Sequence, residues 1–348
     1  MFASNINYSR TISLATASSL EGFCSFADEQ HKRFNSQSAW RGPRGAGVLL
    51  ILAGLLVVLA SVAGGYLLER GNLLVLMQPA ELIIIAGCAV GVVLASCPAR
   101  NLRALFTALG SIFTQRRYTT ESYLEALKVL YVLFHVGRGS GVAALEPHVE
   151  RPYESEVFLA HAALLSDSAA TDFICDSFRI AISAGLTADE VERLMTRDMD
   201  VQRSGRQQPL RVLANLADSL PGVGIIAAVL GVVVTMQSLS GQTSEIGQKV
   251  AAALVGTFLG ILLCYGFVGP IANHLECLSK ARSEYLQVLR VAVISFFHGA
   301  SPVVAAEAAR RTVPLDLRPS LDEMEAQLRR EKIPLTKAQK EALASREA

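Results

Sequence analysis

Charge-free apolar stretches divide the chain. Four runs contain no Asp, Glu, Lys or Arg and are dominated by Leu, Val, Ile, Ala and Gly. A helix needs about 20 apolar residues to cross a bilayer core, so these runs predict four transmembrane helices, the second at the short end of the range. A buried helix of a soluble domain is the alternative for that second run, although it closes a hairpin with the first. The four runs are residues 45–68, 82–99, 219–244 and 250–273.

The long polar region between the second and third runs has helical patterning. Thr119 or Thr120 is placed to cap a helix whose apolar residues recur every three or four positions. Thr187 with Glu190 forms a capping-box pattern before another helix. The polar segment 204–209 is predicted to be a linker. No part of the chain has the alternation of a β-strand.

The two ends of the chain are polar. Residues 275–295 are amphipathic and are predicted to continue the last membrane helix, while residues 320–331 form a charged, solvated helix. The Ser-rich start lacks the basic and apolar regions of a signal peptide, so a disordered tail is expected. The predicted organisation is a disordered extension (1–46), a transmembrane hairpin (47–97), a cytoplasmic helical domain (98–217), the third and fourth transmembrane helices (218–273), and a cytoplasmic helical extension and tail (274–348).

Lys and Arg placement predicts the orientation. Arg70 is the one basic residue between the first two runs, and Lys249 is the one between the last two. Residues 98–218 carry 13 Lys and Arg, and residues 273–348 carry 12. Because basic loops stay in the cytoplasm, both termini and both long polar regions are expected there. The fold class is an all-α membrane protein with four transmembrane helices, a large helical cytoplasmic region between the second and third, and a cytoplasmic helical tail.

Composition narrows the function class. The chain holds 32 Lys and Arg against 31 Asp and Glu, so its charge gives no case for nucleic-acid binding. It has no metalloprotease, phosphate-loop, nucleophile-elbow or dinucleotide-binding motif. The six cysteines form no CxxC pair, and the six histidines lack metal-ligand spacing. We therefore expect no enzyme, no metal and no cofactor.

Small residues form a face on each of the last two runs. They recur at three- and four-residue steps, which places them on one side of a helix. Such faces predict helices packed closely on each other or around a third element, with ordinary bundle packing as the alternative. None of the four runs holds Asp, Glu, Lys or Arg, so a proton carrier would have to come from another chain. The residues are Pro221, Gly224, Ala228, Gly231 and Thr235, then Ala253, Thr257, Gly260 and Cys264.

Three segments carry a family resemblance. They read QPAELIIIAG at 78–87, DSLPGVGIIAAVLGVV at 218–233 and ALVGTFLGILLCYGFVGP at 253–270. Together they resemble MotA, the stator subunit family of the bacterial flagellar motor, within the wider family of MotA, ExbB and TolQ. The resemblance extends from about residue 47 to 328. Residues 1–46 depart from it, because family members usually start close to the first span.

The resemblance implies a machine rather than an enzyme. Family members form a ring, expected to be a pentamer, around two MotB chains in the bacterial inner membrane. MotB supplies the membrane aspartate that carries the proton, and the ring drives the rotor protein FliG. The runner-up function is a TolQ- or ExbB-type energiser of an outer-membrane process, distinguished by its partner. A small-solute transporter and a membrane scaffold without transport are alternatives from other classes.

Site residues follow from the same resemblance. Arg138 and Glu146 match charged positions that contact the rotor, with a solvated surface pair as the alternative. Pro221 and Pro270 match prolines with a conformational role, with plain helix-end prolines as the alternative.

Channel-lining positions are implied at Gly224, Gly260, Ala228 and Thr257. Sodium-driven relatives carry a threonine at the position of Ala228, where a hydroxyl can replace part of the water shell of sodium. The methyl group of Ala228 offers no such oxygen, so proton transport is expected. The alternative is that Ala228 only packs and the partner alone sets selectivity.

Overall fold

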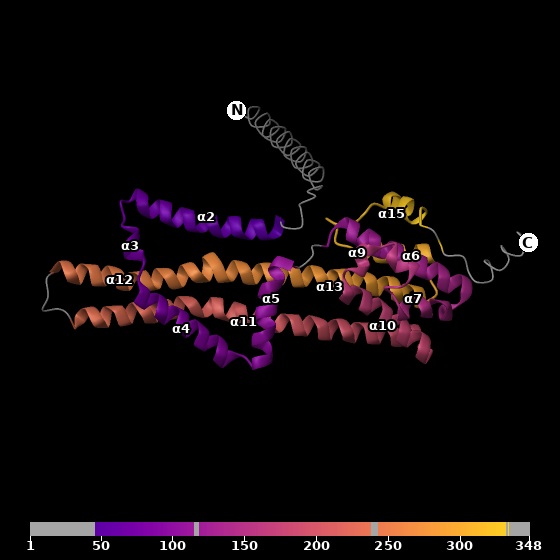
Figure 1. The fold of residues 1–348 in the computed structure, drawn as a ribbon, viewed down its shortest axis with the longest axis horizontal. Helices are drawn as coiled ribbons and strands as arrows, with labels where there is room; N and C mark the ends of the chain where they lie inside the picture. The colour runs from indigo at the N-terminus through magenta and orange to yellow at the C-terminus, as the bar shows by residue number, and fades with distance from the viewer. Residues whose placement is uncertain (1–45, 115–117, 238–242, 332, 334–348) are drawn as a thin grey trace, which may run out of the picture. The chain divides into compact units, whose positions relative to one another are not determined.

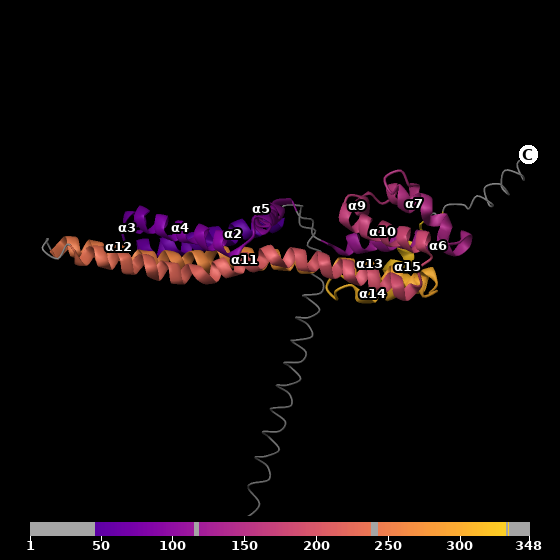
Figure 2. The ribbon, with the colours of Figure 1, turned by 90° about the horizontal axis from the view of Figure 1, so that it is seen from below.

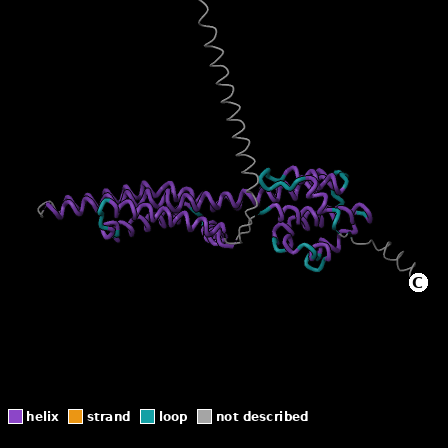
Figure 3. The backbone as a smooth tube through the Cα atoms, turned by 90° about the horizontal axis from the view of Figure 1, so that it is seen from above, coloured by secondary structure: helices purple, strands orange, loops and turns teal. Residues whose placement is uncertain are grey.

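A computed structural model describes residues 46–114, 118–237, 243–331 and 333. Every regular element in these ranges is helical, and none of the described residues forms a strand (Figure 3). The predicted N-terminal extension lies outside the described residues except for Ala46, and so do residues 332 and 334–348 of the predicted C-terminal extension and tail.

Four helices are long and apolar enough to cross a membrane, as predicted. The first is α2 (Ala46–Leu68), and the short α3 (Leu73–Leu76) leads from it into the second, α4 (Pro79–Ser96). The third and fourth candidates belong to α11 (Ala188–Met236) and to the helix that starts with α12 (Thr243–Leu262), which lie side by side (Figures 1 and 2).

The third and fourth helices continue far beyond their apolar parts. α11 has 49 residues and is about 74 Å long at 1.5 Å per residue. α12 runs through a π-helical segment, η2 (Leu263–Val268), into α13 (Gly269–Phe297). The predicted continuation of the last membrane helix is therefore confirmed.

The predicted linker at residues 204–209 is wrong, because α11 passes through it without a break. Its Ser, Arg and Gln residues tolerate a helix well. Pro209 is buried, and Leu210 and Leu213 beside it pack against α5 (Ala99–Thr114) and α13. Packing on both neighbours therefore compensates for the one backbone donor that Pro209 lacks.

A cluster of helices around the far parts of α11 and α13 forms what we call the head. Its core includes Phe134 stacked on Phe296, with ring centroids 4.7 Å apart. Thr119 caps α6, and Thr187 with Glu190 caps α11, so both predicted caps are confirmed. The other head elements are α6 (Thr120–Ser140), η1 (Val142–Leu145), α7 (Glu146–Glu150), α8 (Glu156–Leu159), α9 (Ala162–Leu165), α10 (Ser168–Ala184), α14 (Pro302–Thr312) and α15 (Leu321–Leu328).

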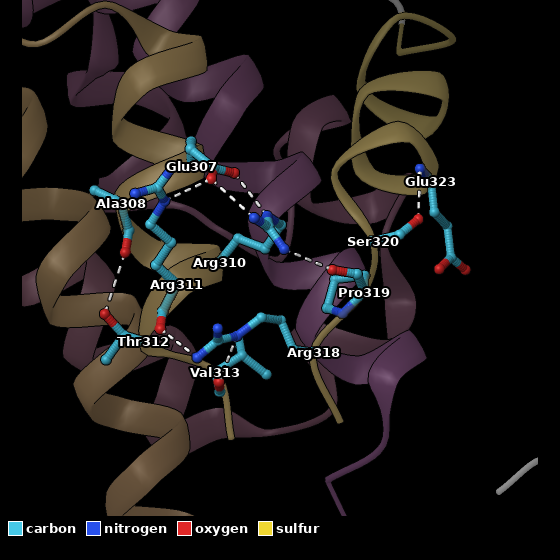
Figure 4. A network of polar contacts seen from close by, with 10 residues as sticks. All are labelled: Glu307, Ala308, Arg310, Arg311, Thr312, Val313, Arg318, Pro319, Ser320 and Glu323. Carbon is cyan, nitrogen blue, oxygen red and sulfur yellow. Dashed lines mark hydrogen bonds and ion pairs between the residues drawn. The ribbon is translucent and has the colours of Figure 1, made fainter. Parts of the chain in front are cut away.

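A polar network fastens the connection between α14 and α15 (Figure 4). Arg310 donates to Glu307 at 2.6 and 2.8 Å and to the carbonyl of Pro319 at 2.9 Å. Arg311 also donates to Glu307, and Arg318 donates to the carbonyl of Arg311 at 2.6 Å. The hydrogen bonds from Arg310, supported by Arg311, lower the pKa of Glu307 to about 2.

Candidate functional site

The crossing of α11 and α12 is a contact between backbones. A Cβ built on Gly224 would lie 2.9 Å from the carbonyl oxygen of Gly256 and from the Cα of Gly260. One built on Gly260 would lie 2.7 Å from the Cα of Gly224 and the carbonyl oxygen of Leu220. Close packing of the two small-residue faces on each other is thus confirmed. That Gly224 and Gly260 line a channel stays a prediction.

Ala228 and Thr257 lie beside this crossing, and both are half-buried. A Cβ built on Gly256, the neighbour of Thr257, would lie 3.2 Å from the backbone nitrogen of Ala228 and from the Cβ of Ala227. The two predicted channel positions therefore belong to facing turns of adjacent helices. This is the arrangement that a shared lining would require, although the lining itself stays a prediction.

Glu81 is a buried carboxylate inside the membrane helices. It lies in the first turn of α4 and is 6% exposed. A Cβ built on Gly231 would lie 3.0 Å from its Oε1, and one built on Gly256 would lie 2.6 Å from its Oε2. That Oε2 is buried and has no hydrogen-bond partner. The second membrane helix therefore starts before the charge-free run 82–99 and includes Glu81, so the expectation that the membrane helices hold no Asp, Glu, Lys or Arg is wrong at this position.

The sequence contains a feature that predicts Glu81 to lie within the second membrane helix. Pro79 favours the first position of a helix, so the second membrane helix begins before the charge-free run and includes Glu81 in its first turn. On α12, Gly256 lies about 9 Å along the helix from the start of its charge-free run. Glu81 therefore lies against the apolar part of α12, and ionisable residues within membrane helices are rare and usually mark ion or substrate paths.

The two predicted conformational prolines both lie within continuous helices. Pro221 is inside α11, and Pro270 follows η2 directly at the start of α13. The N–H of Gly269 donates to the carbonyl of Cys264, five residues back, which is the π-helical pattern. Pro221 is inside α11, so the helix-end alternative is wrong there, whereas Pro270 is in the first turn of α13, a position that the helix-end alternative also fits. A conformational role for them stays a prediction.

Arg138 and Glu146 lie on the head, on α6 and α7, with η1 between these two helices. Arg138 is in the last turn of α6, and its guanidinium donates to the carbonyl of Gly299 at 2.8 Å. Gly299 has a φ of +87° between α13 and α14, so Arg138 also fastens a turn. Glu146 begins α7 and is exposed, as Arg138 is. Both side chains are accessible from solvent, while contact with a rotor stays a prediction.

Known families match both halves of the described chain. The model described as "Motility protein A N-terminal" matches residues 52–141, and that of the MotA/TolQ/ExbB proton channel family matches residues 165–288. The motility protein A of Escherichia coli K12 is 40% identical over 286 residues, which cover 82% of this chain and 97% of that protein. The chemotaxis protein LafT of Vibrio parahaemolyticus is 32% identical over 272 residues, 78% of this chain and 95% of that protein.

Solved structures share the fold. The flagellar MotAB stator complex of Bacillus subtilis aligns with a TM-score of 0.63 and 22% identity, over 79% of this chain and 98% of that one. The MotAB structure of C. jejuni aligns with a TM-score of 0.66 and 18% identity, over 78% and 98% of the two chains. The chain belongs to the motility protein A family, within the MotA/TolQ/ExbB proton channel family.

Proposed function

We propose that this chain is a stator subunit of the bacterial flagellar motor, in which ion flow through a complex with MotB generates torque. The observation that carries the proposal is the 40% identity to a motility protein A over 97% of that protein's length. A TolQ- or ExbB-type energiser is the second candidate, but the match of residues 52–141 to the motility protein A N-terminal model favours the motor.

The membrane part supports an assembly with further chains. Large apolar side chains on the membrane half of α11 are exposed, among them Ile225, Val229 and Val233 at 49–55%. A ring of these subunits around MotB helices would cover such a surface, as a pentamer around two MotB chains would. The MotB aspartate would carry the proton, and Glu81 would lie in the wall of the same membrane region.

The proposed sidedness follows the basic residues. With both termini and the head in the cytoplasm of the inner membrane, residues 98–218 and 273–348 keep their Lys and Arg inside. The exposed Arg138 and Glu146 would then be available to charged groups of the rotor protein FliG.

The proposed ion is the proton. Ala228 presents a methyl group where a hydroxyl would be needed to coordinate a dehydrated sodium ion, and of these two positions only Thr257 has a side-chain oxygen. Swimming speed should therefore be independent of external sodium at fixed pH and should collapse with a protonophore. A speed that follows the sodium concentration would overturn the assignment.

Deletion of the gene in the bacterium that encodes it tests the stator role. The deletion strain should assemble flagella that do not rotate, and a plasmid copy should restore rotation. Affinity purification of the chain should recover MotB. Normal swimming combined with an outer-membrane defect and recovery of TolR or ExbD would support the second candidate instead.

A further inference from the structure

A basic cavity lies where α5 crosses α11 and α13, just beyond the membrane part of these helices. Its volume is about 480 Å³, and its walls come from all three helices. Figures 1 and 2 both show α5 lying across the two long helices at this level. Apolar side chains such as Ala108, Leu210 and Leu275 line one part, and two guanidinium groups, of Arg206 and Arg282, line another.

The charge of this cavity is one-sided. None of the described residues that line it carries a carboxylate. The larger adjoining cavity of about 800 Å³ shares Arg206 with it but is also lined by Asp200, Glu276 and Glu284, so its charges are mixed. The smaller cavity is therefore the one that would attract an anion.

Carboxylates near Arg206 and Arg282 only partly balance the positive charge of the two guanidinium groups. Arg282 is 21% exposed, and its Nε is buried without a hydrogen-bond partner. Its carboxylate neighbour is Asp167 at 3.9 Å, and that carboxylate already accepts from the hydroxyl of Tyr118 and the backbone N–H of Ala170. Arg206 donates to the neutral amide oxygen of Gln202.

Burial and the positive charge of the neighbouring arginine both disfavour the charged form of Arg206. Burial, with the positive charge of Arg282, lowers the pKa of Arg206 to about 10, so that Arg206 still carries its charge at neutral pH. Half-buried like charges are costly unless an opposite charge joins them. A planar guanidinium matches the oxygens of a phosphate group and can donate to it with two parallel hydrogen bonds.

We propose that Arg206 and Arg282 form a binding site for a phosphate group in the cavity between α5, α11 and α13. The phosphate would come from the headgroup of an anionic phospholipid or from free phosphate. Two features fit an amphiphile: the apolar part of the wall, and the amphipathic α5, on which Arg100 and Phe106 are exposed. Basic pockets next to membrane helices bind phospholipid headgroups in the same way.

Arg103 provides the matched control for the test. It is an exposed arginine on α5 that does not line the cavity, so Arg103→Gln removes the same charge near the membrane without touching the site. The chain is purified with its MotB partner and compared with Arg206→Gln, Arg282→Gln and Arg103→Gln. Retained lipid is measured by native mass spectrometry after exchange into vesicles of phosphatidylcholine, with or without phosphatidylglycerol. Melting temperature is measured with inorganic phosphate against equal ionic strength of chloride.

The unmodified complex should retain phosphatidylglycerol, or should be stabilised by inorganic phosphate but not by chloride. The first result identifies the lipid headgroup as the source, and the second identifies free phosphate. Binding should weaken about tenfold in Arg206→Gln and Arg282→Gln and stay within about twofold in Arg103→Gln. Without a phosphate source, Arg206→Gln should melt no lower than the unmodified protein, because it removes a repulsion.

Two results would overturn the site. One is the absence of any response to both probes in the unmodified complex. The other is an equal loss in Arg103→Gln, which would mean that general surface charge holds the phosphate. Should Arg282→Gln fail to fold, Arg206→Gln and competition between the two probes on the unmodified complex decide the question.

Discussion

A single methyl group at Gly260 should separate α11 from α12. In the structure, a Cβ at this position lies 2.7 Å from two backbone atoms, the Cα of Gly224 and the carbonyl oxygen of Leu220. That is about 0.7 Å short of ordinary van der Waals contact, and backbone atoms in close-packed helices cannot turn aside as a side chain would. Gly260→Ala should therefore destabilise the chain by about 1–3 kcal/mol, the usual cost of overpacking.

Gly222→Ala is the matched control for this change. Gly222 lies on α11 two residues from Gly224, and a Cβ built on it meets nothing within 4 Å. In a helix interior the replacement of Gly by Ala should stabilise by about 0.5–1 kcal/mol. Unfolding of the purified chain in detergent measures both variants, and rotation of tethered cells measures function. Equal stability of Gly260→Ala and Gly222→Ala would refute the backbone contact.

Three further variants test the head and the membrane carboxylate. Arg138→Glu should slow swimming at unchanged membrane levels, and a compensating charge reversal on the rotor should restore it; if protein levels fall in parallel, the bond to Gly299 is what matters. Glu307 has a depressed pKa, so its stabilising effect is present above pH 4.5 and is lost as the pH falls towards 2. In chemical denaturation, Glu307→Gln should lower the free energy of unfolding by about 1 kcal/mol at neutral pH. Between pH 4.5 and 2 the free energy of unfolding should fall less in this variant than in the unmodified protein, and identical pH profiles would contradict this. Glu81→Gln keeps the shape and removes the charge, so it should lower proton flux without changing the melting temperature, whereas a lower melting temperature with normal flux would indicate a packing role.

The sequence allowed prediction of the elements that depend on local chemistry. The four apolar helices and the caps at Thr119 and Thr187 follow from composition and from hydrogen bonds within a few residues. The segment 204–209 was mispredicted because polar residues suit both a linker and a helix that packs on one side. Only the contacts of Leu210 and Leu213 with α5 and α13 decide between these states.

The candidate site was less accessible to prediction, because it depends on contacts between distant segments. The charge-free run 82–99 excludes Glu81, although Pro79 indicates that the second membrane helix starts earlier. The hydrogen bond from Arg138 to the carbonyl of Gly299 joins residues 161 positions apart, and a repeating pattern of apolar residues cannot predict such a contact. The arginine pair at Arg206 and Arg282 likewise exists only once α11 and α13 are packed together.

Proton flux in reconstituted vesicles tests the central claim most directly. The chain alone, the chain with MotB, and the chain with MotB whose membrane aspartate is replaced by asparagine are compared at equal protein content and equal pH gradient. The account predicts flux only from the chain with unmodified MotB, since the partner supplies the carrier. Substantial flux from the chain alone, or flux unaffected by the aspartate replacement, would contradict it.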